Sequence, residues 1–166
     1  MWLFPANMRK CIGKGHPLPP LCKRHRIMRR TATIMLHWLS FVLLVLLLAG
    51  GPSPALSWAF GLSALGMCVL AITGGLMNGP GPKLEGPLRT AHPWMSRAMY
   101  AALGTGAALT LWAQIGGTPG PGTLAHFYVY LFAASALHGI FHLWRHTALN
   151  DGALRRITPT TMHGML

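Results

Sequence analysis

Four apolar stretches of about twenty residues constrain this chain more than any other feature. They run from about Thr33 to Gly50, from about Ala55 to Met77, from about Met95 to Ile115, and through the first twenty or so residues of Leu124–Asp151. An apolar helix of about 20 residues is long enough to cross the hydrocarbon core of a bilayer. Of the 166 residues, 52% are hydrophobic and only 10% are charged, which is unlike an ordinary soluble domain. The sequence therefore predicts an all-α membrane protein, a bundle of four transmembrane helices.

The distribution of basic residues predicts the orientation of this bundle. All 14 Lys and Arg residues fall in the N-terminal tail, at or within the 78–97 connection, or after Trp144, whereas the turns at 50–54 and 116–122 have none. Basic segments that flank membrane spans remain on the cytoplasmic side. With four spans the three basic segments share one side, so we expect both termini to be cytoplasmic.

Three regions follow from this pattern. Residues 1–30 form a basic, proline-containing tail, which we expect to be a disordered leader; a lipid-surface or partner-binding arm is the alternative, and Met8 and Met28 are further possible start sites. Residues 31–150 form the transmembrane domain and residues 151–166 a cytoplasmic tail. The net charge of +12 indicates anionic membrane lipids as a partner and not nucleic acid, because most basic residues lie in one tail of an otherwise hydrophobic chain.

The near absence of acidic side chains excludes several kinds of chemistry. Glu85 and Asp151 are the only two, so paired-carboxylate catalysis and an oxygen-ligand metal site are not expected. The sequence contains no nucleophile–base pair and no phosphate-binding loop, and we assign no catalytic residue. Cys11 and Cys22 form no CxxC pair, and a disulfide between them stays possible.

Histidines inside the spans supply the candidate site. His138, His142 and His146 recur every four residues, so they share one face of the fourth helix. A histidine inside a span needs a partner for its polar nitrogens. His37 lies in the first span at the same depth as His138, roughly 6–10 Å from the cytoplasmic boundary. Two imidazoles on antiparallel helices can ligate iron from opposite faces, so we predict a haem between His37 and His138. The alternative is two separate histidines, each hydrogen-bonded within the bundle.

Other residues receive secondary assignments. We predict that one or more interfacial arginines, with Arg30, Arg89 and Arg145 as candidates, pair with the haem propionates. His142 could transfer a proton, contact a quinone, or replace His138 as the iron ligand. His146 is either an additional residue of the site or a solvated side chain. We expect His92 and His163 to be ordinary loop histidines.

Two motifs point to a family. Arg30-x6-His37-Trp38 in the first span and His146-x4-Asp151-x4-Arg156-x2-Pro159 in the tail resemble the bacterial cytochrome b561 family. The resemblance implies a multi-pass b-type cytochrome of the bacterial inner membrane. Such proteins exchange electrons with quinone, one as a superoxide:ubiquinone oxidoreductase, and relatives are haem subunits of dehydrogenases and hydrogenases. It also implies haem b, with the cytoplasmic-side ligands at His37 and His138.

The chain departs from the family pattern for a second, outer haem. Ser57 and Trp58 stand near the place of the second-span ligand, and Leu124 stands where the outer ligand of the fourth span is expected. His126 lies twelve residues before His138, which places it about 120° around the helix, so we expect it to bind no iron. The family also commonly has a histidine four residues before Tyr100, where this chain has Ser96. These departures indicate a single-haem variant, or one adapted to a different partner.

Two functions from different classes remain open at this point. The first is an electron-transfer cytochrome working with quinone or a partner redox subunit. The second is a haem-poor scaffold or anchor subunit of a larger membrane complex.

Overall fold

The computed structural model describes residues 20–76, 79–81 and 83–165, and within these ranges it is helical and has no strand. The four long helices are α2 (Pro20–Gly50), α3 (Pro54–Gly74), α4 (Gly86–Gln114) and α5 (Thr123–Ala148). Two short 3-10 helices, η2 (Leu154–Arg156) and η3 (Thr160–Met165), follow α5. The prediction of an all-α chain with four long helices is confirmed.

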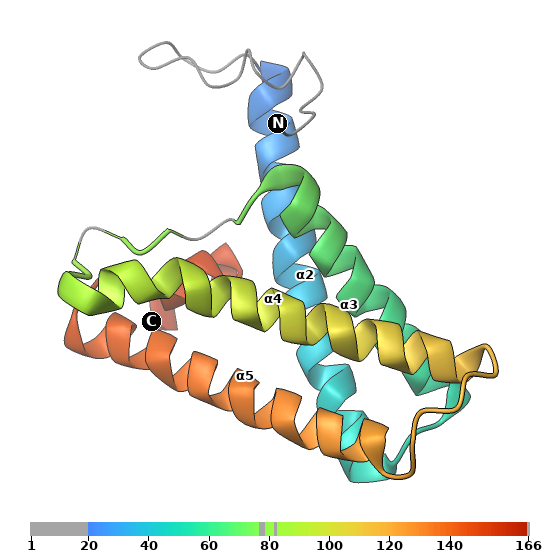
Figure 1. Cartoon of the computed structure of the whole chain (residues 1–166). Coiled ribbons are helices and arrows are strands. Elements are labelled where there is room, and N and C mark those ends of the chain that lie inside the picture. The colour runs from blue at the N-terminus through green and yellow to red at the C-terminus, as the bar shows by residue number, and fades with distance from the viewer. Residues whose placement is uncertain (1–19, 77–78, 82, 166) are drawn as a thin grey trace, which may run out of the picture.

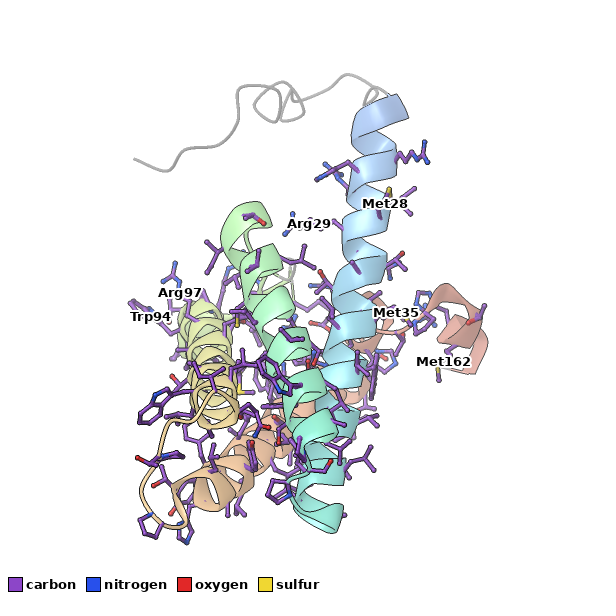
Figure 2. The ribbon with its side chains drawn as sticks, turned by 90° about the vertical axis from the view of Figure 1, so that its right-hand side faces the viewer. Met28, Arg29, Met35, Trp94, Arg97 and Met162 are labelled. Atoms are coloured by element: carbon purple, nitrogen blue, oxygen red, sulfur yellow. The ribbon has the colours of Figure 1, made fainter. Side chains whose placement is uncertain are left out.

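The helices form two pairs (Figure 1). Helices α2 and α3 are antiparallel neighbours, and α4 and α5 lie beside each other and cross the first pair steeply (Figures 1 and 2). Helix α3 packs closely against both α2 and α4, whereas α5 packs less closely against α2 and α4. The looser packing around α5 leaves space between α5, α2 and α4.

Two helices begin earlier than the hydropathy pattern predicts. Helix α2 begins at Pro20, so residues 20–30 of the predicted tail are helical, while 1–19 lie outside the described residues. Helix α4 begins at Gly86 and continues through Pro93. Proline disfavours helical geometry in the residue before it, which is why the sequence pattern placed the start of this helix after Pro93.

The turn between α2 and α3 is built from local signals. Gly51 has a φ of +77°, a left-handed conformation that glycine adopts without a steric penalty. The Ser53 hydroxyl oxygen accepts a hydrogen bond of 3.3 Å from the Leu56 amide, and Pro54 occupies the first turn of α3. This capping arrangement returns the chain antiparallel to α2.

The tightly packed core lies toward the uncharged turns. It contains Leu43, Leu44, Leu47, Phe60, Ala64, Ala107, Tyr128 and Leu131. The hydroxyl groups of Thr110 and Tyr128 lie 2.8 Å apart, which pairs two polar groups between α4 and α5. Gly106 of α4 is buried, and a side chain at this position would meet the ring of Phe127. Packing at this end therefore uses small residues and paired hydroxyls.

The outer surface is strongly apolar (Figure 2). Helices α2, α3 and α5 are each long and apolar enough to cross a membrane. Helix α4 is not among them, and the charged Arg97 and polar Gln114 are the residues of its apolar part that lower its mean hydropathy most. Exposed apolar side chains such as Val42, Leu62 and Tyr130 suit contact with lipid and not with water.

Candidate cofactor cavity

The cavity lies between the four long helices and the C-terminal segment, and Leu44, Phe60 and Leu131 belong both to its lining and to the core. Its volume is about 650 Å³. Protein interiors leave few voids larger than a water molecule, whereas ligand pockets commonly have volumes of about 300–1,000 Å³. The apolar lining includes Ile34, Phe41, Leu44, Phe60, Met67, Met99, Leu103, Leu131, Leu143 and Ile157. This lining suits a large and mostly apolar ligand.

His37 reaches the cavity from α2. Its side chain makes no hydrogen bond to any residue that the structure describes, and its ring packs edge-on against Trp38 at 5.8 Å between centroids. The Trp38 indole Nε1 donates a 3.0 Å hydrogen bond to the Ile157 carbonyl. The two rings of the His37-Trp38 motif thus have different roles. The indole binds the backbone of the C-terminal segment, and the imidazole lines the cavity.

His138 and His142 reach the same cavity from successive turns of α5. Their ring centroids are 4.5 Å apart, with the planes at 70°. The Nδ1 atom of His138 is buried and has no hydrogen-bond partner among the described residues. A buried imidazole nitrogen without a partner is costly, so it marks a position where another group is expected. The structure therefore brings His37, His138 and His142 together.

His92 is the residue that the sequence analysis missed. It was predicted to lie in a loop, but it lies within α4, it is only 2% exposed, and neither ring nitrogen has a hydrogen-bond partner within the described ranges. Its ring is 6.1 Å from that of His142. The prediction of a loop at His92 is wrong because the helix continues through Pro93 to Gly86 and does not begin near Met95. The sequence contains one signal for it, because His92, Ser96, Met99 and Leu103 recur at the spacing of one helical face. The last three of these residues line the cavity.

The arginines predicted to meet a ligand differ in their surroundings. Arg145 is buried in an ion pair with Asp151, with side chains that are 1% and 0% exposed. Its Nε donates to the Asp151 carboxylate at 2.7 Å, and one Nη donates to the Pro80 carbonyl at 2.6 Å. This arrangement favours a structural role for Arg145 over a contact with propionates. Arg156 lines the cavity instead.

Arg30 and Arg89 donate hydrogen bonds to backbone carbonyl groups of other segments. An Nη atom of Arg30 donates to the Arg155 carbonyl at 3.1 Å, and an Nη atom of Arg89 donates to the Gly81 carbonyl at 2.9 Å. Neither arginine lines the cavity. Both instead help to hold connecting segments at the cavity end of the molecule.

The C-terminal segment closes this end of the cavity. Leu154, Arg156, Ile157, Thr158 and Met162 all line it. The segment is held by the hydrogen bonds from Trp38 to the Ile157 carbonyl and from Arg30 to the Arg155 carbonyl. An Nη atom of Arg156 also donates to the Gly79 carbonyl at 3.2 Å. The predicted cytoplasmic tail is thus an ordered wall of the cavity.

The remaining histidines lie elsewhere. His126 is exposed near the start of α5, beside Gly122, and does not line the cavity. His146 is half-buried in the last turn of α5 and is also not part of the lining. His163 lies in η3, where its Nε2 is 3.2 Å from the Thr158 carbonyl oxygen. Of the histidines predicted from the sequence to bind the ligand, only His37, His138 and His142 meet.

No protein family model, no curated protein and no solved structure matches this chain.

Proposed function

We propose that this chain is a membrane b-type cytochrome that holds one haem b between His37 and His138. The observation that carries the proposal is that these two histidines, one hundred residues apart on α2 and α5, line one apolar cavity of about 650 Å³. Neither ring makes a hydrogen bond to a described residue, which leaves both imidazoles available to a ligand and supports the proposal. The likeness of the His37-Trp38 and His146–Pro159 motifs to the cytochrome b561 family points the same way.

The residues around the cavity fit this group. A haem is a large apolar ring with two propionates on one edge, and it would supply reversible one-electron chemistry when two imidazoles ligate its iron. The apolar side chains of α2, α4 and α5 would exclude water, and the C-terminal segment covers the open end. Arg156 of that segment lines the cavity, so we assign to it the propionate contact for which the sequence offered Arg30, Arg89 and Arg145.

Quinone or a partner redox subunit is the proposed exchange partner. With His37 and His138 both holding the iron, no coordination site would stay open, so such a protein would exchange electrons and would not bind oxygen. His142 lies next to His138 within the cavity and is the side chain best placed to pass a proton to a quinone. An additional ligand role for His146 has no support from its position outside the lining.

The first test is the haem content of the purified chain. We expect about one haem b per chain, because His37 is the one histidine that α2 contributes to the cavity and only one pair across it can form at a time. A pyridine haemochrome assay measures the stoichiometry, and a reduced-minus-oxidised spectrum reports a low-spin iron. A chain purified from haem-replete cells without haem would contradict the proposal and favour the scaffold function, and two haems per chain would restore the complete family pattern.

We propose further that all four helices span the bacterial inner membrane with both termini in the cytoplasm. The three basic segments contact one another in the structure, as expected if they share one side. Arg30 of α2 donates to Arg155 of the C-terminal segment, and Lys83 of the 79–85 connection donates to the Asn150 carbonyl at 3.1 Å. The uncharged turns lie at the other ends of the same helices.

Reporter fusions test this topology. Fusions after Pro54 and after Gly120 should report an external location, because the turns there lack the Lys and Arg that retain a segment in the cytoplasm. Alkaline phosphatase and green fluorescent protein fusions at the same positions give opposite readouts and control for expression. A cytoplasmic signal at either position would exclude the four-span arrangement.

A further inference from the structure

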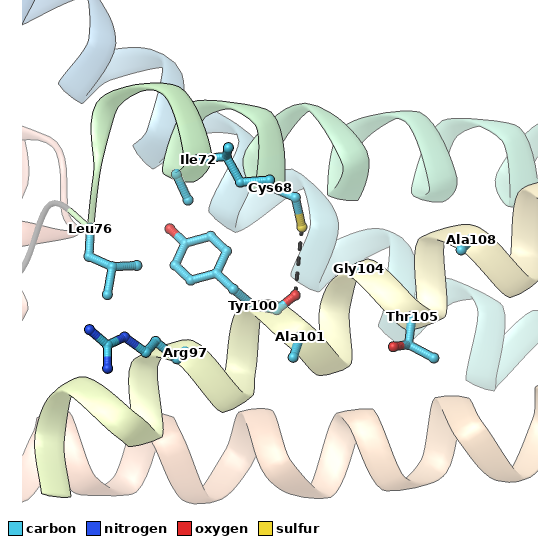
Figure 3. Close-up of a pocket in the computed structure, with 10 residues that line it drawn as sticks. Cys68, Ile72, Leu76, Arg97, Tyr100, Ala101, Gly104, Thr105 and Ala108 are labelled. Atoms are coloured by element: carbon cyan, nitrogen blue, oxygen red, sulfur yellow. Dashed lines mark hydrogen bonds between the residues drawn. The ribbon is translucent and has the colours of Figure 1, made fainter. Parts of the chain in front are cut away.

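A second hollow lies on the outer face of the molecule, between α3 and α4 (Figure 3). Its volume is about 590 Å³, and it opens to the outside of the helix pair. The α4 side of the lining includes the small residues Ala101, Gly104, Thr105 and Ala108 beside Arg97 and Tyr100, and the α3 side includes Cys68 and Ala71. Ala101, Thr105 and Ala108 are exposed. Small residues on one helix therefore form an open apolar groove between two close helices.

The floor of the groove is formed by the close approach of the two helices. The Cys68 thiol donates to the Tyr100 carbonyl at 3.7 Å, and a side chain at Gly104 would touch the Cys68 sulfur at 3.5 Å. The shallow channel above this floor follows the axis of α4.

One end of the groove is cationic. Figure 3 shows Arg97 and Leu76 at this end and Ala108 at the other. Arg97 is exposed and forms no ion pair with any residue that the structure describes. Its guanidinium carbon lies 5.0 Å from the ring centroid of Trp94, which is 69% exposed (Figure 2). An exposed Trp beside a cation is typical of the membrane interface, where the headgroups lie.

No described residue supplies an anion to Arg97. Of the chain's two acidic side chains, Asp151 is buried against Arg145, and Glu85 lies at the start of α4, twelve residues before Arg97. An arginine guanidinium binds a phosphate through two parallel hydrogen bonds. A phosphate from outside the chain is therefore the complementary group.

The length of the groove matches a lipid chain. Arg97 and Ala108 are eleven residues apart, or about 16 Å along a helix. One leaflet of the hydrocarbon core has a thickness of about 15 Å. A lipid with its phosphate at Arg97 would thus place one acyl chain along the whole groove.

We propose that this groove binds one anionic phospholipid, with the phosphate at Arg97 and an acyl chain over Ala101, Gly104 and Ala108. The inference rests on the membrane placement proposed above and is independent of haem. The cytoplasmic leaflet, where the basic segments place Arg97, carries the anionic lipids. Arg97 is thereby a recognition residue for a headgroup.

Native mass spectrometry of the full chain tests the proposal. The protein is released from nanodiscs made of equal amounts of phosphatidylglycerol and phosphatidylcholine, and the retained lipids are identified by mass. We expect one phosphatidylglycerol per chain, retained at least about fivefold over phosphatidylcholine, as one interfacial charge contact allows. Arg97→Gln should abolish this preference. Arg155→Gln, which removes an exposed charge from the C-terminal segment, should preserve it.

A second variant tests the groove itself. Ala101→Phe with Ala108→Phe keeps the surface apolar but fills the channel, so it should lose the bound lipid even though Arg97 is intact. Equal loss in Arg97→Gln and Arg155→Gln would show diffuse attraction and overturn the proposal. A lipid-free dimer would assign the groove to a second copy of this chain and would overturn it too. These outcomes do not depend on haem content, and the reporter fusions test the membrane placement separately.

Discussion

Replacing His37 or His138 by alanine is expected to lower haem affinity by at least about tenfold, since loss of an outer hydrogen-bonding partner alone costs that much at metal sites. Each change removes one of the two proposed ligands, which line the cavity from α2 and from α5. Iron that keeps one imidazole becomes five-coordinate, which shifts the spectrum from low to high spin. Haem content and spectra are compared with wild type at matched protein yield.

The neighbouring histidines supply matched controls. His142→Ala should retain more haem than His138→Ala, although both residues line the cavity and their rings are 4.5 Å apart. His126→Ala should leave the spectrum unchanged, because His126 lies at the other end of α5. Added imidazole should restore the low-spin spectrum of His138→Ala. If His142→Ala empties the site and His138→Ala does not, the ligand lies one turn further along α5; normal spectra in all of the variants would exclude this histidine pair.

Asp151→Asn is expected to lower the free energy of unfolding by about 3–5 kcal/mol, the cost of leaving a buried charge without its partner. Arg145 is 1% exposed, and Asp151 is the acidic group that neutralises it. Asparagine keeps an oxygen for the Ala153 amide, which now donates to the Asp151 carboxylate at 2.8 Å, so this variant isolates the loss of charge. Reversible denaturant unfolding in micelles measures the change.

Two further variants test the cause. The double change Arg145→Leu with Asp151→Leu removes both charges and should recover most of the lost stability, as replacing buried ion pairs by apolar residues commonly does. Lys83→Ala, which removes an exposed 3.1 Å hydrogen bond to the Asn150 carbonyl, should cost about 1 kcal/mol. An Asp151→Asn variant no less stable than Lys83→Ala would contradict the assignment of a buried pair that anchors the C-terminal segment.

The sequence by itself determined the elements and most of the candidate site. Hydropathy predicted four helices because their apolar side chains are clustered in runs of about twenty, and the helix ends beside the uncharged turns at 50–54 and 116–122 agree closely with the structure. Helical periodicity placed His138 and His142 on one face, and the depth argument paired His37 with His138. These are local properties, since each depends on residues a few positions apart.

Tertiary structure alone decided how distant segments meet. Sequence spacing did not show that α4 and α5 cross the other pair steeply, that Asp151 neutralises Arg145, or that Arg156 and not Arg145 lines the cavity. It also missed His92, because the helical state of a residue before proline depends on packing that outweighs its local preference. The packing of whole helices determines which residues meet when they lie from six to over a hundred positions apart, as Arg145 and Asp151 or Arg30 and Arg155 do. A local sequence pattern does not predict such contacts.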